Sequence, residues 1–406
     1  MHVREGFSTM FIRRNFIRFR HSSPLNLLLI NMGLLDELFT GFFFIGLPLL
    51  RGQLGLTYEQ IGLIFSAGAL SSIVVDPPLY LLSDRGSKRW WILGGLLGLT
   101  CAYLLAGSTN SFVLLMLAFI LMYPANSMAV GLSQAALIDH APGEGERIMT
   151  RWTMLSSIGD FLSPLAVTTI ISFGLGWSGL CWIAAGCWLV AALLMWVQRF
   201  PQRHTSYSHK DDEPSVSIRA GLRLALRDTV LLRWIVLSTL TTMLDEIFLT
   251  FLILYLRDVL RASPLISGLT VGAGMVGGFL GLFLLDRLLG HVAPVRLLRL
   301  ASLLALLGVL GLLLVRALWF APLAFFIVSL GSACLYPIAE AQAYARLPGR
   351  SGVVRFISSL GQPFEVVLPA IVGFVAGQFG LLASLVLLGS APVFFLLLVP
   401  RSDKGV

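Results

Sequence analysis

Apolar runs of about 20 residues recur along the whole chain, and they restrict the folds that it can adopt. An α-helix rises 1.5 Å per residue, so such a run crosses roughly 30 Å of hydrocarbon. Hydrophobic residues make up 57% of the chain and charged residues 12%. So few charges do not cover the surface of a soluble protein of 406 residues. The sequence therefore predicts an all-α membrane protein.

We predict twelve transmembrane helices, at residues 25–50, 59–83, 90–107, 112–139, 148–174, 177–196, 231–255, 264–285, 294–315, 318–345, 352–379 and 381–399. The first is too long for a signal peptide and has acids in its middle. The one long hydrophilic break follows the sixth helix. We therefore divide the chain into a basic N-terminal segment (1–24), a six-helix bundle (25–200), a linker (201–229), a second six-helix bundle (230–400) and a tail (401–406).

Lysine and arginine are divided unevenly between the predicted loops. Alternate loops, counted from the N-terminus, hold 25 of the 29 Lys and Arg residues, and the other loops hold only Arg51, Arg257, Arg261 and Arg316. Basic residues accumulate in cytoplasmic loops. The pattern predicts a multi-pass protein of the inner (cytoplasmic) membrane with both termini in the cytoplasm. The net charge of +8 is then a signal of topology, and we expect no nucleic-acid partner.

The second part of the linker alternates basic and apolar residues at helical spacing: Arg219, Arg223 and Arg227 beside Ile218, Leu222 and Leu226. This pattern suits a basic amphipathic helix on the anionic cytoplasmic leaflet. A solvated linker helix explains it equally well.

The two halves repeat the same short motifs at matching places. "LLDELF" at 34–39 matches "MLDEIF" at 243–248, and "SSIG" at 156–159 matches "SSLG" at 358–361. Asp84-Arg85 matches Asp286-Arg287, and Tyr123-Pro124 matches Tyr336-Pro337. Six helices per repeat give parallel halves with the working site at their interface near the bilayer midplane. We interpret Pro124 and Pro337 as bends that help alternating access.

Two six-helix halves, a basic linker, cytoplasmic termini and an acidic-basic turn after the second helix together resemble the major facilitator superfamily. The likeness covers essentially the whole chain. The family's loop signature is an Asp-Arg followed by Gly and basic residues, and this chain has "SDRGSKRW" at 83–90. It departs from the signature at Tyr80, where a helix-packing glycine is expected, and at Gly86, which comes one residue early. The overall pattern is most similar to the bacterial drug-exporter-like branches.

The resemblance implies a rocking motion of one half against the other, with the site between them. It also implies that Asp84, Arg85, Asp286 and Arg287 form a cytoplasmic latch that does not touch substrate. The family's antiporter signature on the fifth helix is only hinted at, by Gly159 and Pro164. The direction of transport therefore stays open in the sequence.

Several carboxylates fall near the middle of predicted membrane helices: Asp36, Glu37, Asp160, Asp245, Glu246 and Glu365. By helical rise they lie roughly 16–20 Å into the bilayer. An ionised carboxylate there costs at least about 2.5–3.5 kcal/mol on insertion scales, so it should face a polar cavity, find a partner or take up a proton. We expect no Lys, Arg or His beside them, because Arg151 and Arg355 lie only a few residues inside the helix ends.

These acids are candidates for binding protons and substrate in a central cavity. Adjacent residues on a helix point about 100° apart, so we expect one member of each Asp-Glu pair to face the cavity and the other to bond a neighbouring helix. Asp160, Glu365 and Glu340, which lies on the tenth helix, are equally well explained by structural roles. For Asp76, followed by two prolines, we favour a structural or gating role.

The sequence thus favours a secondary transporter: a proton-coupled exporter of a cationic or amphipathic small molecule. The alternative is a proton-coupled uptake symporter for a neutral or cationic nutrient, a metal ion or a lipid. An embedded enzyme or a receptor is disfavoured, because the chain lacks a nucleotide-binding loop and a nucleophile-base pair. The four cysteines lack metal-ligand spacing. We expect a monomer surrounded by lipid, with no cofactor and a proton gradient as its energy source.

Overall fold

A computed structural model describes residues 23–84, 86–141, 143–198, 200, 218–315 and 317–399. Within these residues the chain is helical, apart from one isolated bridge between Leu289 and Val292. Twelve of its helical segments are long and apolar enough to cross a membrane. The predicted all-α fold with twelve membrane-spanning segments is confirmed. The N-terminal segment, most of the linker and the tail lie outside the described residues.

The first half contains six spans, and five of them are single helices. Its elements are α1 (Pro24–Leu54), α2 (Tyr58–Ser83), α3 (Lys88–Ser108), α4 (Phe112–Asn126), the π-helix η1 (Ser127–Gly131), α5 (Leu132–His140), α6 (Gly145–Ser172) and α7 (Trp177–Val197). The fourth span consists of α4, η1 and α5. A π-helix places one extra residue in the turn and often marks a functional site.

The second half follows α8 (Ile218–Arg227) and is interrupted more often. Its elements are α9 (Thr229–Leu240), the 3₁₀ helix η2 (Thr241–Leu244), α10 (Glu246–Asp258), α11 (Pro264–Leu288), α12 (Pro294–Leu314), the 3₁₀ helix η3 (Leu318–Phe320), α13 (Ala321–Ser332), α14 (Leu335–Arg346), α15 (Ser351–Ser359), α16 (Gln362–Phe379), α17 (Leu381–Leu388) and α18 (Ala391–Leu398). The seventh, tenth, eleventh and twelfth spans are each built from more than one helix.

Polar residues at the helix ends explain several of these boundaries. The Ser23 hydroxyl accepts the Asn26 amide at the start of α1, and Thr57 and Gln60 form a reciprocal cap on α2. Gly55 ends α1 in the left-handed conformation, with φ of 62°, which glycine adopts without a Cβ clash. These caps satisfy backbone groups that a helix terminus leaves without partners.

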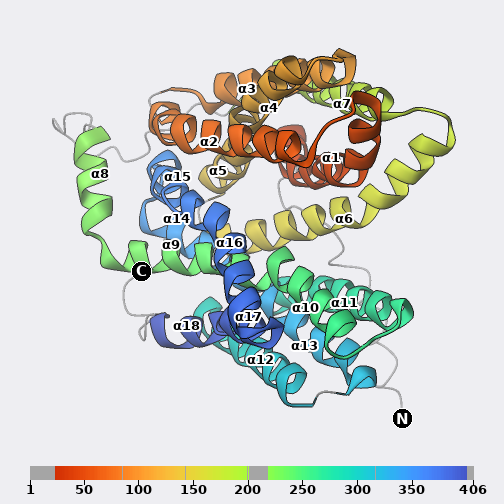
Figure 1. The fold of residues 1–406 in the computed structure, drawn as a ribbon. Helices are drawn as coiled ribbons and strands as arrows, with labels where there is room; N and C mark the ends of the chain where they lie inside the picture. The colour runs from red at the N-terminus through yellow and green to blue at the C-terminus, as the bar shows by residue number, and fades with distance from the viewer. Residues whose placement is uncertain are drawn as a thin grey trace, which may run out of the picture.

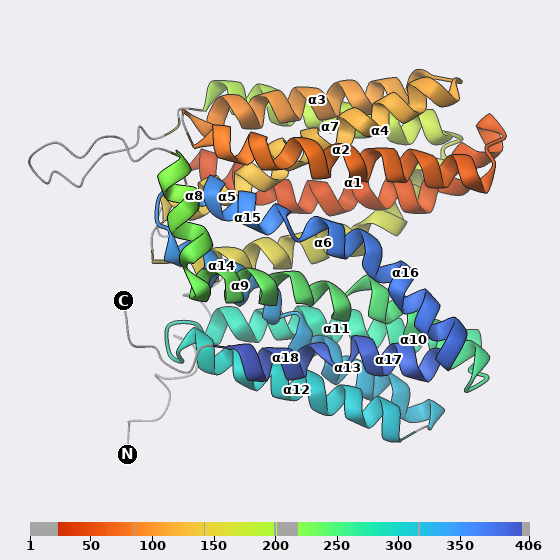
Figure 2. The ribbon, with the colours of Figure 1, turned by 60° about the vertical axis from the view of Figure 1, so that its left-hand side comes forward.

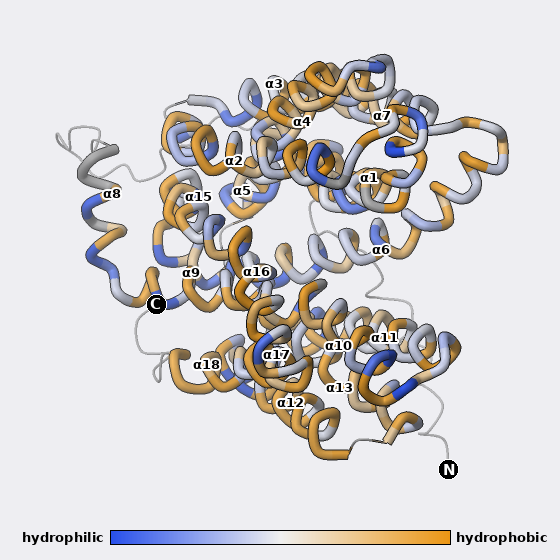
Figure 3. Tube along the Cα trace, viewed as in Figure 1, coloured by the Kyte–Doolittle hydropathy of each residue, from blue (hydrophilic) through white to orange (hydrophobic). Residues whose placement is uncertain are grey.

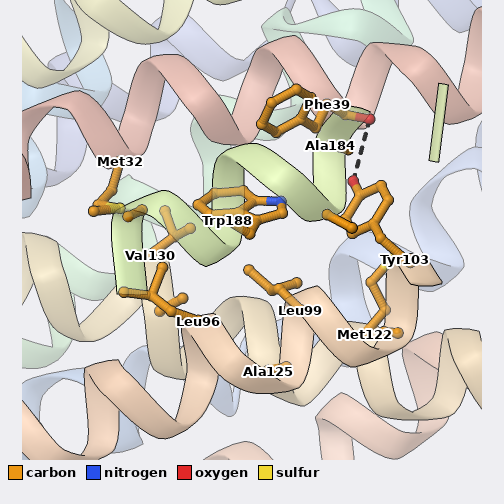
Figure 4. Packing of buried hydrophobic residues seen from close by; sticks show 14 of the residues in the cluster. Met32, Phe39, Leu96, Leu99, Tyr103, Met122, Ala125, Val130, Ala184 and Trp188 are labelled. Atoms are coloured by element: carbon orange, nitrogen blue, oxygen red, sulfur yellow. Dashed lines mark hydrogen bonds between the residues drawn. The ribbon is translucent and has the colours of Figure 1, made fainter. Parts of the chain in front are cut away.

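Each half has its own hydrophobic core, and the two bundles lie one above the other (Figure 1). In the first half Phe39 of α1 packs against Trp188 of α7 and Tyr103 of α3, and the Tyr103 hydroxyl donates to the Phe39 carbonyl at 3.3 Å (Figure 4). Many apolar side chains are exposed on both bundles, such as Leu193, Leu314 and Phe374. Hydrophobic residues occur along most helices of both bundles (Figure 3). An apolar exterior of this kind suits lipid contact.

The two halves meet mainly at one end of the molecule. There α2 and α5 pack on α15, and α6 packs on α11 and α14. The linker helix α8 lies at this end too, which we call the linker end (Figure 2). Toward the opposite end, the ribbons of α1 and α2 diverge from those of α10 and α16 (Figure 2).

Within α8, Leu222 and Ala225 contact the core of the second half, whereas Arg223, Leu226 and Arg227 are exposed. Part of the apolar face of this helix is therefore used inside the protein.

Candidate functional site

Asp84, at the end of α2, connects the two halves at the linker end. Its two carboxylate oxygens accept the backbone N–H groups of Gly352 and Val353, each at 3.1 Å, in the first turn of α15. A Cβ at Gly352 would lie 2.4 Å from the Tyr80 carbonyl oxygen and 2.6 Å from Asp84 Cγ. Only glycine permits this close approach of the two helices.

Lys88 extends this contact at the start of α3. Its ammonium lies 3.3 Å from Asp84 and also binds Asp139 of α5 and the Ser351 hydroxyl of α15. Ser351 in turn donates to Asp139 at 2.8 Å. Lys88 is 8% exposed, so this ion pair is shielded from water and salt.

Asp286, the second copy of the acidic motif, pairs with arginines of α6. Arg151 Nε lies 3.0 Å from Asp286 Oδ1, and Arg147 Nε lies 3.8 Å from it. Arg287 instead places its guanidinium over the Phe283 ring, 5.0 Å from the ring centre. Arg151 is thus the closest described cation to Asp286, whereas Arg85 lies outside the described residues.

Asp76 forms a contact between the halves deeper in the bundle. Its Oδ2 accepts the Ser72 hydroxyl at 2.5 Å, the Ser127 hydroxyl at 2.6 Å and the Gln362 side-chain amide at 3.0 Å. Ser127 begins the π-helix of the first half, and Gln362 begins α16 of the second. Asp76 is fully buried. The two following prolines lie inside α2 without ending it.

Glu340, on α14, accepts the Ser238 hydroxyl of α9 at 2.7 Å and is 2% exposed. One turn earlier on α14, the Tyr336 hydroxyl accepts the side-chain amide of Gln134 from the first half at 3.3 Å. Glu340 and Gln134, which occupy matching places in the repeat, therefore have different partners.

Arg355 of α15 lies in the middle of these groups. It is within electrostatic range of Glu340, Asp76 and Glu365, and its Nε has no hydrogen-bond partner. The expectation that no basic residue accompanies the acids was wrong here. In the sequence, Arg355 lies only a few residues from the end of its predicted helix. That position does not reveal that α15 packs against α2 and α14, which carry Asp76 and Glu340.

The first acidic pair lies in the middle of α1. Asp36 bonds the Asn126 side chain at the end of α4. Glu37 lies on the side of α1 that faces α6, because a Cβ at Gly159 would come within 3.1 Å of Glu37 Cβ. The neighbouring Asp160 of α6 has an exposed side chain. The two members of the pair thus face different helices.

The second acidic pair lies at a break in the backbone. The 3₁₀ helix η2 ends at Leu244, Asp245 adopts a non-helical conformation, and α10 begins at Glu246. Asp245 is exposed, and the side chain of Glu246 is not among the described ones. Glu365, one turn into α16, is exposed as well. Discontinuous helices of this kind build substrate and ion sites in many transporters.

The predicted proline bends lie beside irregular turns. Pro124 lies inside α4, three residues before the π-helix, and Pro337 lies two residues after the start of α14, next to the break between α13 and α14.

Arg355, Gln362 and Asp139 belong to the contact between the halves but were not predicted from the sequence. Asp139 lies at the end of its predicted helix (112–139). Its register on α5, which brings it to Lys88, was the only available signal.

An apolar groove of about 660 Å³ lies between α11 and α13, with Leu265, Leu269 and Val276 on one side and Pro322 and Phe326 on the other. It lies apart from the acids. Among the residues that the structure describes, no three His, Cys, Asp or Glu side chains are grouped so that they could hold a metal ion.

Comparisons with solved structures find the same fold in other transporters. A Major Facilitator Superfamily transporter, FucP, in the outward conformation has a TM-score of 0.78 at 17% identity, over 93% of this chain and 97% of that chain. The Escherichia coli fucose:proton symporter FucP gives 0.76 at 16% identity, over 93% and 97%. The human organic anion transporter MFSD10 gives 0.70 at 19% identity, over 93% and 99%.

Comparison with the curated proteins finds no match. The model of the family described as Major Facilitator Superfamily, however, matches residues 29–364. That range takes in nearly all of the first half and the second half as far as the start of α16. The chain therefore belongs to the major facilitator superfamily.

Proposed function

We propose that this chain is a proton-coupled secondary transporter that exports a cationic or amphipathic small molecule by alternating access. Its family identifies it as a multi-pass membrane transporter and not an enzyme. Within the family we place it near the drug-exporter-like branches. It works as a monomer in lipid, without a cofactor, and the proton gradient supplies the energy.

One observation carries the proposal: acids from both halves lie midway along membrane spans. Asp36 is half-buried and Asp160 and Asp245 are exposed, on α6 and at the break before α10. An exposed carboxylate at this depth is tolerated where it reaches an aqueous cavity or takes up a proton. A cavity with this charge attracts cations and repels anions.

The closed linker end supports our assignment of this conformation to the outward-open state of the transport cycle. We take the linker end as cytoplasmic, because Lys and Arg accumulate in the loops on that side. Asp84, Lys88 and Asp286 then close the cytoplasmic side, and the cavity opens outward. The likeness to FucP in its outward conformation agrees with this assignment.

The apolar groove between α11 and α13 supports an amphipathic cargo. It offers an apolar surface large enough for a small molecule, and it lies in the same half as Asp245. An amphipathic molecule needs an apolar surface of this kind besides a group that binds its charge.

Uptake is the second candidate, and two observations favour it. FucP is described as a fucose:proton symporter. The cluster around Arg355 also offers amide, phenol and carboxylate groups, which suit a neutral polar cargo. In this version the same acids bind the proton, and cargo and proton move in one direction.

Purified protein in liposomes tests the function. A panel of radiolabelled cations, dyes and neutral sugars is assayed with and without an imposed pH gradient, in both gradient directions. We expect gradient-driven flux of cationic dyes opposite to the proton flux, and the double variant Asp36→Asn with Glu37→Gln should lose it at least tenfold. The matched variant Asp245→Asn with Glu246→Gln tests the second pair.

Flux of a neutral sugar in the same direction as the protons would support uptake instead. Gradient-driven flux that persists in both double variants would remove the paired acids from the mechanism.

A further inference from the structure

Asp76 has hydrogen-bond partners in both halves of the protein. Its three hydrogen-bond donors come from its own helix (Ser72), from the π-helix of the first half (Ser127) and from α16 of the second half (Gln362). It is 0% exposed. Its hydrogen bond with Gln362 therefore exists only while the two halves are together at this place.

The three donors share one oxygen of the carboxyl group. All of them reach Oδ2, whereas Oδ1 is buried and has no hydrogen-bond partner. An ionised carboxylate offers two equivalent oxygens, and burying one of them without a donor is costly. A neutral carboxylic acid with its proton on Oδ1 leaves that O–H group without an acceptor, but this costs less than burying a negative charge that has no ion-pair partner.

The charged and titratable groups around Asp76 do not form an ion pair with it. Tyr80 lies one turn further along α2, and Arg355 approaches from α15 within electrostatic range but without a salt bridge. Glu365 of α16 and Glu340 of α14 also lie within electrostatic range of Arg355. The π-helix contributes only the hydroxyl of Ser127. Among the described residues no cation forms a salt bridge with Asp76, although the charge of Arg355 acts on it through space.

The π-helix also connects Asp76 with the first acidic pair. Asn126 bonds Asp36, and the next residue, Ser127, bonds Asp76. Two acids on different helices are therefore bound by consecutive residues at one irregular turn.

We propose that Asp76 is a proton-binding site that holds its proton on Oδ1 while the linker end is closed and releases it when that end opens. Opening separates Gln362 from Asp76 and exposes the carboxyl group to water, where it ionises. Proton binding and closure then stabilise each other, so acid favours the closed state and alkali the open one. The inference rests on the proposed proton coupling and assigns it a residue outside the acidic pairs.

The test measures closure directly and needs neither cargo nor gradient. Spin labels are attached to cysteines at Ser87 and His291, two exposed positions at the linker end of the two halves, after the exposed Cys101 and Cys187 have been replaced by serine. Distances are measured between pH 5.5 and pH 8.5 in lipid nanodiscs. We expect one short distance at acid pH and a second, longer population that grows at least threefold at alkaline pH.

Asp76→Asn, which resembles the neutral acid, should keep the short distance at both pH values. His140→Gln, made in parallel, removes another titratable side chain at the linker end and leaves Asp76 and its donors in place, so it should keep the response to pH. A wild-type distance that ignores pH, or a pH response that survives in Asp76→Asn, overturns the proposal.

Infrared spectroscopy of the folded wild-type protein provides a second measurement in case Asp76→Asn does not fold. A protonated carboxylic acid has a carbonyl band of its own, and Ser127→Ala should shift that band because Ser127 bonds Oδ2. Absence of a band that responds to Ser127→Ala would count against the proposal. If closure follows Asp76 while liposomes show no flux driven by a pH gradient, the transport proposal fails and the proton site stands.

Discussion

The two halves carry the same motifs but build them on different backbones. "LLDELF" lies inside α1, a single helix of 31 residues, whereas "MLDEIF" spans the end of η2 and the start of α10. Gly33 precedes the first motif and packs against Trp152. Thr241 and Thr242 precede the second, and the Thr241 hydroxyl donates to the Ser238 carbonyl at 2.6 Å. Such side-chain bonds compete with the helix ladder.

The difference extends beyond these motifs. In the described part of the first half, spans one, two, three, five and six are single helices, whereas spans seven, ten, eleven and twelve of the second half are interrupted. A helix bends most easily at places where backbone hydrogen bonds are missing. We infer that the first half moves as a rigid unit and that the second half bends, so an equivalent pair of substitutions should have unequal effects.

The largest expected effect comes from the matching glycines of "SSIG" and "SSLG". A Cβ at Gly159 would lie 2.4 Å from the Leu34 carbonyl oxygen, whereas one at Gly361 would lie 2.7 Å from the Thr239 hydroxyl, which can rotate away. We expect Gly159→Ala to lower the free energy of unfolding by about 1–3 kcal/mol or more. Gly361→Ala should cost less than half as much. Thermal unfolding in detergent measures the loss of stability in both variants. Equal losses would show that the contact between α1 and α6 at Gly159 is no more rigid than the contact at Gly361.

A smaller difference is expected between the two acidic motifs at the linker end. Asp84→Ala leaves the backbone N–H groups of Gly352 and Val353 without acceptors and should cost about 1–3 kcal/mol in total. Asp286→Ala removes ion pairs whose side chains are 21–23% exposed at the Arg151 contact, and such pairs contribute about 0–1 kcal/mol. The measurement is the fraction of closed linker end in the spin-labelled protein.

Salt separates the two contacts further. Raising the salt concentration should reduce the effect of Asp286→Ala by screening and leave that of Asp84→Ala nearly unchanged. The comparison fails if both substitutions open the linker end equally and respond alike to salt.

The smallest effect concerns the caps of the first helix in each half. Ser23 caps α1 with a hydroxyl, and Asp228 caps α9 through the amides of Val230 and Leu231. Burial raises the pKa of Asp228, but the hydrogen bonds from Leu231 and Arg346 outweigh it and hold this pKa below its ordinary value. Either substitution by alanine should cost about 0.5–2 kcal/mol near neutral pH.

The pH dependence of the two caps should differ. A lowered pKa in the folded state adds stability above the unfolded value of about 4, and this stability is lost as the pH falls through the folded value. Asp228→Ala should therefore matter less at pH 3 than at pH 7, whereas Ser23→Ala should cost the same at both. Urea unfolding at the two pH values measures this, and a cost of Asp228→Ala that does not change with pH contradicts it.

The twelve spans could be predicted from sequence because hydropathy and loop charge depend on nearby residues only. The contact of Asp84 with the other half was also within reach, since a family resemblance suggested it. The role of Arg355 and the helix break at Asp245 could not be predicted from the sequence. The position of Arg355 among acids depends on how α15 leans against α2 and α14, and the break depends on a hydroxyl one turn earlier. Both require knowledge of packing, which short patterns do not contain.

The position of Asp84 has a consequence for the transport cycle. Helix α15 begins after Arg350 without a capping side chain of its own, and a carboxylate from the other half takes that place. One bundle thus completes the secondary structure of the other. When the bundles separate at this end, the first turn of α15 loses the Asp84 cap and becomes prone to fraying. The order of this helix turn therefore changes together with the conformation of the whole protein.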